Sequence, residues 1–117
     1  MRDYKKYQVW TKAHKLALDV YALTKNFPKS EQYGITSQLR RASLSIPTNI
    51  VEGTGRNSEK EFAYFINIAA GSAAEVEYLL IFSKDYAYIS ENEHEKINAE
   101  VVSVRKMLNA LYSKVKS

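Results

Sequence analysis

Two histidines and a few glutamates are the residues of this chain that could bind a metal ion. Glu91 and His94 have the Glu-x-x-His spacing that di-iron helical bundles place on inward-facing helices. Such a site needs a second motif of this kind and two further glutamates, yet His14 has Thr11 at the matching position. We therefore interpret the motif as the solvated start of a helix and expect no metal and no cofactor.

The serines and the remaining glutamates do not form a catalytic arrangement. Ser43, Ser45 and Ser72 have no base near them in the sequence, and two histidines leave little from which to build a triad. Glu75 and Glu77 are two residues apart, which directs their side chains to different faces of a helix. These groups are typical of polar helix packing, so the chain is not expected to be an enzyme.

The net charge of +4 is unevenly distributed along the 117 residues. Residues 1–29 hold seven basic and two acidic residues, whereas residues 57–89 hold two basic and five acidic ones. A basic end is typical of a protein with an anionic partner, although a segment that only keeps one end soluble has the same composition. Basic and aromatic residues alternate in the first eight positions, a pattern that can bind phosphates and stack on bases, although chain termini are also often only loosely ordered. The predicted nucleic-acid contacts are Arg2, Lys5, Lys6, Lys12 and Lys15.

The composition predicts a single helical domain over residues 1–117, a length at which domains are common. The chain has no cysteine, so a disulfide framework and a thiolate metal site are both excluded. It also lacks a signal-peptide pattern and an apolar run of about 18 residues. We therefore expect a cytoplasmic protein that does not enter a membrane.

Apolar residues at steps of three and four predict four helices. The first begins at Val9 and ends before Pro28, because a proline disfavours helical backbone in the residue that precedes it. The second begins at Ile35 or Thr36, with Thr36 as its expected cap. It should end with a left-handed glycine cap, at Gly53 or Gly55.

The connection after the second helix contains two glycines and an arginine, as a phosphate loop does. It lacks the Gly-Lys-Ser/Thr ending of such loops, and no strand precedes it, so a tight turn is predicted. Capping boxes then open the third helix at Ser58 and Glu61 and the fourth at Ser90 and Glu93. Small residues at positions 69–74 mark the centre of the third helix as a place where another helix or subunit approaches closely, at Gly71.

The second helix carries the most informative stretch of the chain, residues 38–56. Pro47 lies inside it, has no amide hydrogen and crowds the carbonyl of Ser43, at a cost of roughly 3 kcal/mol in an isolated helix. We therefore expect a helix that is kinked at Pro47 and contacts protein on more than one side. A polar stripe runs beside its apolar stripe and contains Gln38, Arg41, Ser45, Asn49 and Glu52.

This stretch resembles the proteins encoded by intervening sequences in 23S ribosomal RNA genes, a family that includes the accessory variability proteins of diversity-generating retroelements. The resemblance covers nearly the whole chain and implies an all-α, antiparallel, up-down four-helix bundle that assembles into a ring-like homopentamer. It rests on Gln38, Arg41, Ala42, Ser45, Ile46, Pro47, Asn49, Ile50, Glu52, Gly53 and Arg56, and on Gly71, Ser72, Glu75 and Glu77 of a second motif.

The subunit contacts are expected on the second and third helices. The polar stripe has an alternative interpretation as a hydrogen-bond network inside one monomer. A further expectation is that Glu75 or Glu77 pairs with Arg40 or Arg41 of the second helix. The predicted interface residues are Gln38, Arg41, Ser45, Pro47, Asn49, Glu52, Arg56, Gly71, Ser72 and Glu75.

Two functions agree with these features. In the first, the chain is a nucleic-acid-binding accessory protein, and assembly multiplies its basic segment into a ring that binds RNA or DNA backbone with little sequence preference. In the second, it is a scaffold that docks a protein partner, such as a reverse transcriptase, and has no direct nucleic-acid role. Salt distinguishes them, because phosphate contacts weaken steeply as salt rises and apolar docking does not.

Overall fold

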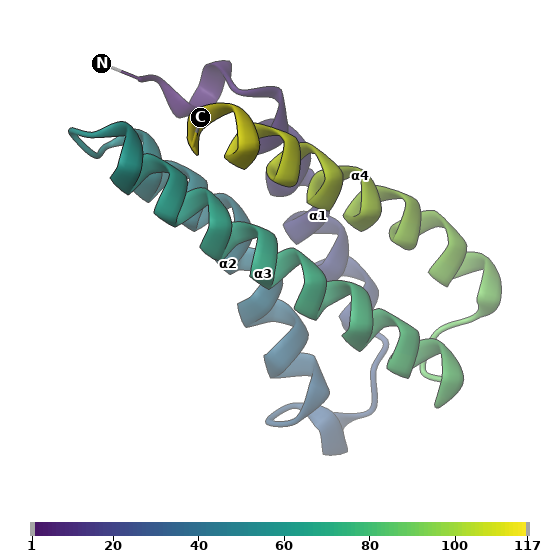
Figure 1. Cartoon of the computed structure of the whole chain (residues 1–117). Helices are drawn as coiled ribbons and strands as arrows, with labels where there is room; N and C mark the ends of the chain where they lie inside the picture. Colours follow the sequence, from purple (N-terminus) through teal and green to yellow (C-terminus); the bar gives the residue numbers. More distant parts are fainter. Residues whose placement is uncertain (1, 117) are drawn as a thin grey trace.

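Four helices make up most of the chain, in a computed structural model that describes residues 2–116 (Figure 1). No strand occurs within these residues, so the prediction of an all-α protein with four helices is confirmed. α2 packs against α1 and α3, and α4 packs against α3 and α1, which forms a bundle of 43 × 23 × 19 Å. The elements are η1 (Tyr4–Lys6), α1 (Gln8–Thr24), η2 (Lys29–Glu31), α2 (Ile35–Thr54), α3 (Glu59–Asp85) and α4 (Glu91–Lys116).

The core consists of the apolar stripes that the sequence pattern predicts. Leu16 of α1, Leu39 of α2, Ile66 of α3 and Leu108 of α4 have no exposed surface. Burying one such side chain stabilises the fold by about 1.5–3 kcal/mol, so this shared core holds the four helices together. By length and composition α3 is also apolar enough to cross a membrane, a property that core helices of soluble proteins share.

α2 runs without interruption from Ile35 to Thr54, with Pro47 inside it. Pro47 is buried, and the helix contacts α1 and α3. The expectation that this helix meets protein on more than one side is therefore confirmed. Packing on two sides offsets the hydrogen bond that the proline cannot make.

The predicted capping box at the start of α4 is complete, and the one at the start of α3 shows its serine half. Ser90 Oγ accepts a hydrogen bond from the Glu93 amide at 3.0 Å, and Glu93 accepts one from the Ser90 amide at 2.8 Å. At the start of α3, Ser58 Oγ accepts from the Glu61 amide at 3.1 Å. Each serine satisfies an amide that the first turn of a helix leaves without a partner.

The end of α2 differs from the prediction. Gly55 follows the last helical residue, Thr54, with φ −84° and ψ −1°, which is right-handed backbone, so the predicted left-handed cap is wrong. Gly53 lies inside the helix and is buried. A Cβ atom there would lie 3.0 Å from the side chains of Phe62 and Phe65, so this glycine allows α3 to approach α2 closely.

The start of α2 also needs a correction. Its N-cap is Gly34, which gives no side-chain hydrogen bond, so the prediction of Thr36 as the cap is wrong. Thr36 lies within the first turn and is buried, and its hydroxyl has no hydrogen-bond partner within residues 2–116. The Ile35 amide is satisfied by the carboxylate of Glu31 at 3.3 Å.

The turn between α3 and α4 is built on Ala87, whose φ of 65° is left-handed. The amide of Tyr88 bonds to the carbonyl of Ser83 at 2.8 Å, and the amide of Ala87 bonds to the carbonyl of Lys84 at 3.0 Å. These two bonds define a Schellman motif, in which glycine is the usual residue at the left-handed position. The motif reverses the chain and positions Tyr88 against Glu31, to which its hydroxyl donates at 2.6 Å.

Candidate nucleic-acid interface

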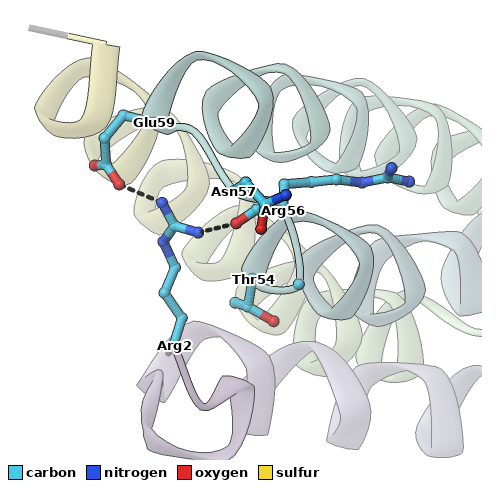
Figure 2. Close-up of a pocket in the computed structure, with 6 residues that line it drawn as sticks. Arg2, Thr54, Arg56, Asn57 and Glu59 are labelled. Carbon is cyan, nitrogen blue, oxygen red and sulfur yellow. Dashed lines mark hydrogen bonds and ion pairs between the residues drawn. The ribbon is translucent and has the colours of Figure 1, made fainter.

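The N-terminal segment, residues 2–7, is anchored to the end of the bundle where α2 is followed by α3 (Figure 1). The guanidinium of Arg2 donates to the carboxylate of Glu59 and, at 2.7 Å, to the carbonyl of Arg56 (Figure 2). It also lies 4.4 Å from the centroid of the Phe62 ring. Arg2 therefore fixes the segment in place, and Glu59 offsets its charge.

The aromatic residues of this segment are used for packing. Tyr7 meets Phe62 edge to face at 5.9 Å between ring centroids, and Tyr4 meets Trp10 at 4.9 Å. Trp10 stacks in turn on His14, with 4° between the ring planes. Tyr4, Tyr7 and Trp10 are half-buried. Because these contacts occupy the rings, the rings are less available for stacking on bases. Contact with phosphates is the remaining way in which the segment can bind nucleic acid.

Three of the five residues predicted to contact nucleic acid carry a positive charge that is not paired with a carboxylate of residues 2–116. Lys5, Lys6 and Lys12 are exposed, and no carboxylate pairs with them in the described part of the chain. Lys15 instead lies 2.6 Å from Asp19 and 3.3 Å from Glu100. These hydrogen bonds raise the pKa of the Lys15 amine. Because Glu100 belongs to α4, Lys15 links α1 to α4.

The fold brings further basic residues to the same end of the bundle (Figure 1). Lys60 is exposed in the first turn of α3, and Lys116, at the end of α4, lies 5.6 Å from the ring centroid of Tyr112. Both are far from the N-terminal segment in sequence, so only the fold reveals that they lie at its end of the bundle. We call this the terminal basic surface, and it consists of Lys5, Lys6, Lys12, Lys60 and Lys116.

A pocket of about 460 Å³ lies beside this surface, and it is a poor site for an anion (Figure 2). Glu59 already pairs with the one guanidinium that reaches into it, that of Arg2. The side chain of Arg56 points away from Arg2, pairs with Glu52 at 3.1 Å and lies over Phe65. The pocket is lined by Arg2, Thr54, Gly55, Arg56, Asn57 and Glu59.

The polar stripe of α2 divides into an inner and an outer part. Ser45 bonds to Ser72 of α3 at 2.9 Å, and the Asn49 amide donates to the carbonyl and hydroxyl of Ser45 at 2.8 and 2.9 Å. This inner part is a network inside the monomer, as the alternative interpretation expected. The outer side chains of the stripe, Gln38 and Arg41, are exposed and line a groove of about 270 Å³ together with Glu75 of α3. None of these three side chains makes a hydrogen bond in the described chain.

The expected pairing of Glu75 or Glu77 with an arginine of α2 is wrong for the described residues. Glu77 accepts a hydrogen bond from Arg105 of α4 at 2.7 Å. Arg40 is held by α1, because its Nε donates to the Thr24 hydroxyl at 2.8 Å and its Nη2 to the Tyr21 carbonyl at 3.3 Å. The periodicity places these side chains on helices, but it does not show which helix each one faces.

Gly71 does not mediate close packing within the monomer. A Cβ atom at this position would meet nothing within 4 Å. Large apolar side chains are exposed at helical spacing on either side of it, and together they form the α3 outer stripe: Tyr64, Ile68, Tyr78 and Phe82. This stripe lies on the opposite face of α3 from the buried Ile66, Ala73 and Leu80.

No metal site is visible in residues 2–116, because no group of three or more potential ligands comes together there. Glu91 is exposed at the start of α4. The Nε2 atom of His94 is buried without a hydrogen-bond partner in this part of the chain. The two residues of the Glu-x-x-His motif therefore lie in different environments.

Comparisons with known proteins agree with the fold. The family model described as 23S rRNA-intervening sequence protein matches residues 5–110. A crystal structure from Bacteroides thetaiotaomicron, of a protein with unknown function from the S23 ribosomal protein family, is 27% identical with a TM-score of 0.81. The similarity covers 89% of this chain and 97% of that one. None of the curated proteins matches this chain.

Proposed function

This chain belongs to the 23S rRNA-intervening sequence protein family, and on that basis we propose that it is a cytoplasmic, non-enzymatic accessory protein that binds the backbone of RNA or DNA as a homo-oligomer. The observation that carries the proposal is the terminal basic surface. Lys5, Lys6 and Lys12 keep their charges free of carboxylates, while neighbouring aromatic rings hold the segment in place. Such cations attract phosphates without reading bases.

Assembly would multiply this surface. The α3 outer stripe gives each monomer an exposed apolar face, and the neighbouring groove presents Arg41 and Glu75, which have opposite charges. A copy of the chain can cover the stripe. We infer a homopentamer, built from up-down antiparallel helices with α2 kinked at Pro47. The short connections at residues 55–58 and 86–90 support the up-down order.

The proposal is tested by fluorescence anisotropy of a labelled structured RNA and a matched duplex DNA across a salt series. We expect sub-micromolar binding that weakens steeply with salt, since each phosphate contact contributes about 0.9 to the slope of log K against log salt on duplex DNA. Changing Lys5 and Lys6 to glutamate should abolish binding without altering the molecular mass of the assembly. The matched control is the same change at Lys96 and Lys106, which are also exposed lysines.

Three results would count against the proposal. Absence of binding by the unmodified protein at low salt would favour the second candidate function, a scaffold whose α3 outer stripe docks a protein such as a reverse transcriptase. Equal losses in the Lys5/Lys6 and Lys96/Lys106 variants would show that only net charge matters. Loss of assembly in the Lys5/Lys6 variant would assign those lysines a structural role.

A further inference from the structure

A second positively charged site lies at the start of α2, at the other end of the bundle from the termini (Figure 1). It is an open pocket of about 320 Å³, formed where the turn before α2 meets α1. None of its lining residues is acidic, and two are arginines. We call it the α2-start pocket, and it is lined by Tyr21, Gln32, Tyr33, Thr36, Ser37, Arg40 and Arg41.

One of its arginines is held in position before any ligand arrives. Arg40 donates to the hydroxyl of Thr24 and to the carbonyl of Tyr21, and its guanidinium lies 4.7 Å from the centroid of the Tyr21 ring. Thr24 is itself fixed, since its hydroxyl donates to the carbonyl of Val20 at 2.8 Å. These contacts leave Nη1 of Arg40 without a partner in the described chain. An arginine that is already oriented loses less conformational freedom when it binds an anion.

The second arginine is free, and its charge is not offset. Arg41 is exposed and makes no ion pair or hydrogen bond within residues 2–116. It lines both the α2-start pocket and the neighbouring groove. Two guanidinium groups on successive residues, one held by hydrogen bonds and one without a partner in the described chain, suit the oxygens of a phosphate group.

The helix start adds donors that have no partner. The amides of Thr36 and Ser37 belong to the first turn of α2, where no preceding turn accepts their hydrogen bonds, and none is found in the described chain. Thr36 is only 8% exposed, and its hydroxyl is buried without a partner. A buried hydroxyl that bonds to nothing is uncommon in a folded protein, and Thr36 is one of the residues that line this pocket.

One carboxylate, that of Glu31, lies near this helix start, and both of its oxygens already accept hydrogen bonds. Glu31 accepts from the Ile35 amide and from the hydroxyl of Tyr88, which belongs to the α3–α4 turn. It satisfies a single amide and is not among the residues that line the pocket. The two arginines outnumber it, so the start of α2 keeps a positive charge.

We propose that the α2-start pocket binds a phosphate group through Arg40, Arg41, the hydroxyls of Thr36 and Ser37, and the first-turn amides of α2. The phosphate of a nucleic-acid strand fits best, because the exposed ring of Tyr33, 91% accessible at the rim, can stack on an adjoining base. The assignment of this phosphate to a nucleic-acid strand rests on the function proposed above. The phosphate site itself does not, and it is tested separately.

The main test is the variant Ser37→Asp. It places a carboxylate in the pocket, where it would repel phosphate, while an acidic residue in the first turn of a helix is favourable to folding. We expect thermal stability that is unchanged or higher, and phosphate affinity that falls by about tenfold or more. The matched control is Asn92→Asp, which adds the same charge at an exposed position in the first turn of α4.

The first arm titrates the protein with inorganic phosphate and follows amide and arginine side-chain signals by NMR. Saturable shifts at Thr36, Ser37 and Arg40, present in the control and absent in Ser37→Asp, would support the site. Absence of saturable shifts in the unmodified protein at millimolar phosphate would overturn it. This arm does not require nucleic-acid binding, so it separates failure of the site from failure of the proposed function.

The second arm measures the affinity of the same proteins for a labelled RNA across a salt series. We expect Ser37→Asp and Arg41→Gln to weaken binding and to lower the salt slope by about 0.7 to 0.9 for each phosphate that the variant no longer neutralises. If phosphate binds and RNA affinity is unchanged, the assignment to a nucleic-acid strand is wrong and the site serves a free phosphate compound.

Discussion

A single hydrogen bond between Tyr88 and Glu31 connects the α3–α4 turn to the segment that precedes α2. The Tyr88 hydroxyl donates to Glu31 at 2.6 Å, and the other oxygen of Glu31 accepts from the Ile35 amide. The bond to the carboxylate raises the pKa of Tyr88 to about 12. The same bond, together with the Ile35 amide, lowers the pKa of Glu31 below its ordinary value of 4.5.

These two shifts predict the pH range in which the bond stabilises the fold. Glu31 contributes stability above its ordinary pKa of 4.5 and loses it as the pH falls through its lowered pKa in the folded protein. The Tyr88 hydroxyl contributes stability below its ordinary pKa of 10.0, and this contribution is lost as the pH rises towards its pKa of about 12 in the folded protein. Tyr88→Phe should therefore lower the melting temperature at neutral pH, and the difference from the unmodified protein should shrink in acid. Thermal unfolding followed by circular dichroism over this range provides the measurement.

A control variant separates this bond from general effects of losing a tyrosine hydroxyl. Tyr64→Phe removes a hydroxyl at an exposed position on α3 and should leave the pH dependence unchanged. A stability difference between Tyr88→Phe and the unmodified protein that stays constant from acid to alkali would contradict the account.

At the residue scale, the sequence predicts local hydrogen bonds and misses distant ion pairs. The serine caps of α3 and α4 are predictable, because donor and acceptor lie three residues apart. The partners of Arg2, Lys15 and Arg105 lie 57, 85 and 28 residues away. Which carboxylate each cation meets depends on the rotation of one helix against another, and apolar periodicity defines that rotation only coarsely. For this reason two of the five predicted nucleic-acid contacts are engaged inside the monomer.

At the scale of the elements, the two helical glycines have opposite surroundings. A Cβ atom at Gly53 would press on Phe62 and Phe65 at 3.0 Å, whereas one at Gly71 would meet open space. Gly53→Ala should destabilise the fold by about 1–3 kcal/mol through overpacking between α2 and α3. Gly71→Ala should stabilise it by roughly 0.5–1 kcal/mol, because alanine has the higher helix propensity. Chemical denaturation of both variants measures the two free energies.

The two glycine variants control for each other, since each adds one methyl group to a helix. Equal changes in the free energy of unfolding would show that the close approach at Gly53 is not a packing constraint. A large loss in Gly71→Ala, accompanied by dissociation, would place a second subunit against this position.

The elements themselves were predictable from the sequence, and their ends less so. Periods of three and four residues account for all four helices. α1 ends at Thr24, before Pro28 as predicted, but earlier than the proline alone requires. The end of α2 was predicted wrongly, since its glycines were assumed to supply left-handed backbone. The position that does adopt it is Ala87, where alanine gives no local signal. The α2-start pocket was missed for a similar reason, because Tyr21 and Arg40 meet only when α1 and α2 pack together.

At the scale of the whole molecule, the α3 outer stripe leads to a prediction about assembly. Gly71→Leu would place a large side chain in the middle of this stripe, where the monomer has room for it. We expect helical content to be preserved and the mass of the assembly to fall, as measured by circular dichroism and by size-exclusion chromatography with light scattering. Asn109→Leu, at an exposed position of α4, is the matched control. An unchanged mass in Gly71→Leu would place the subunit contact on another face.

Arg2 is anchored by residues at the start of α3, so the N-terminal segment cannot be fixed in place until those residues have been synthesised. Arg2 needs Glu59, which lies 57 residues further along the chain, and Phe62, which follows it. At about 5–20 residues per second, the ribosome takes about 3–12 seconds to supply them. During that interval Lys5 and Lys6 belong to a segment that Arg2 does not yet tether to the bundle. A truncated product that stops before α3 carries these lysines without that anchor.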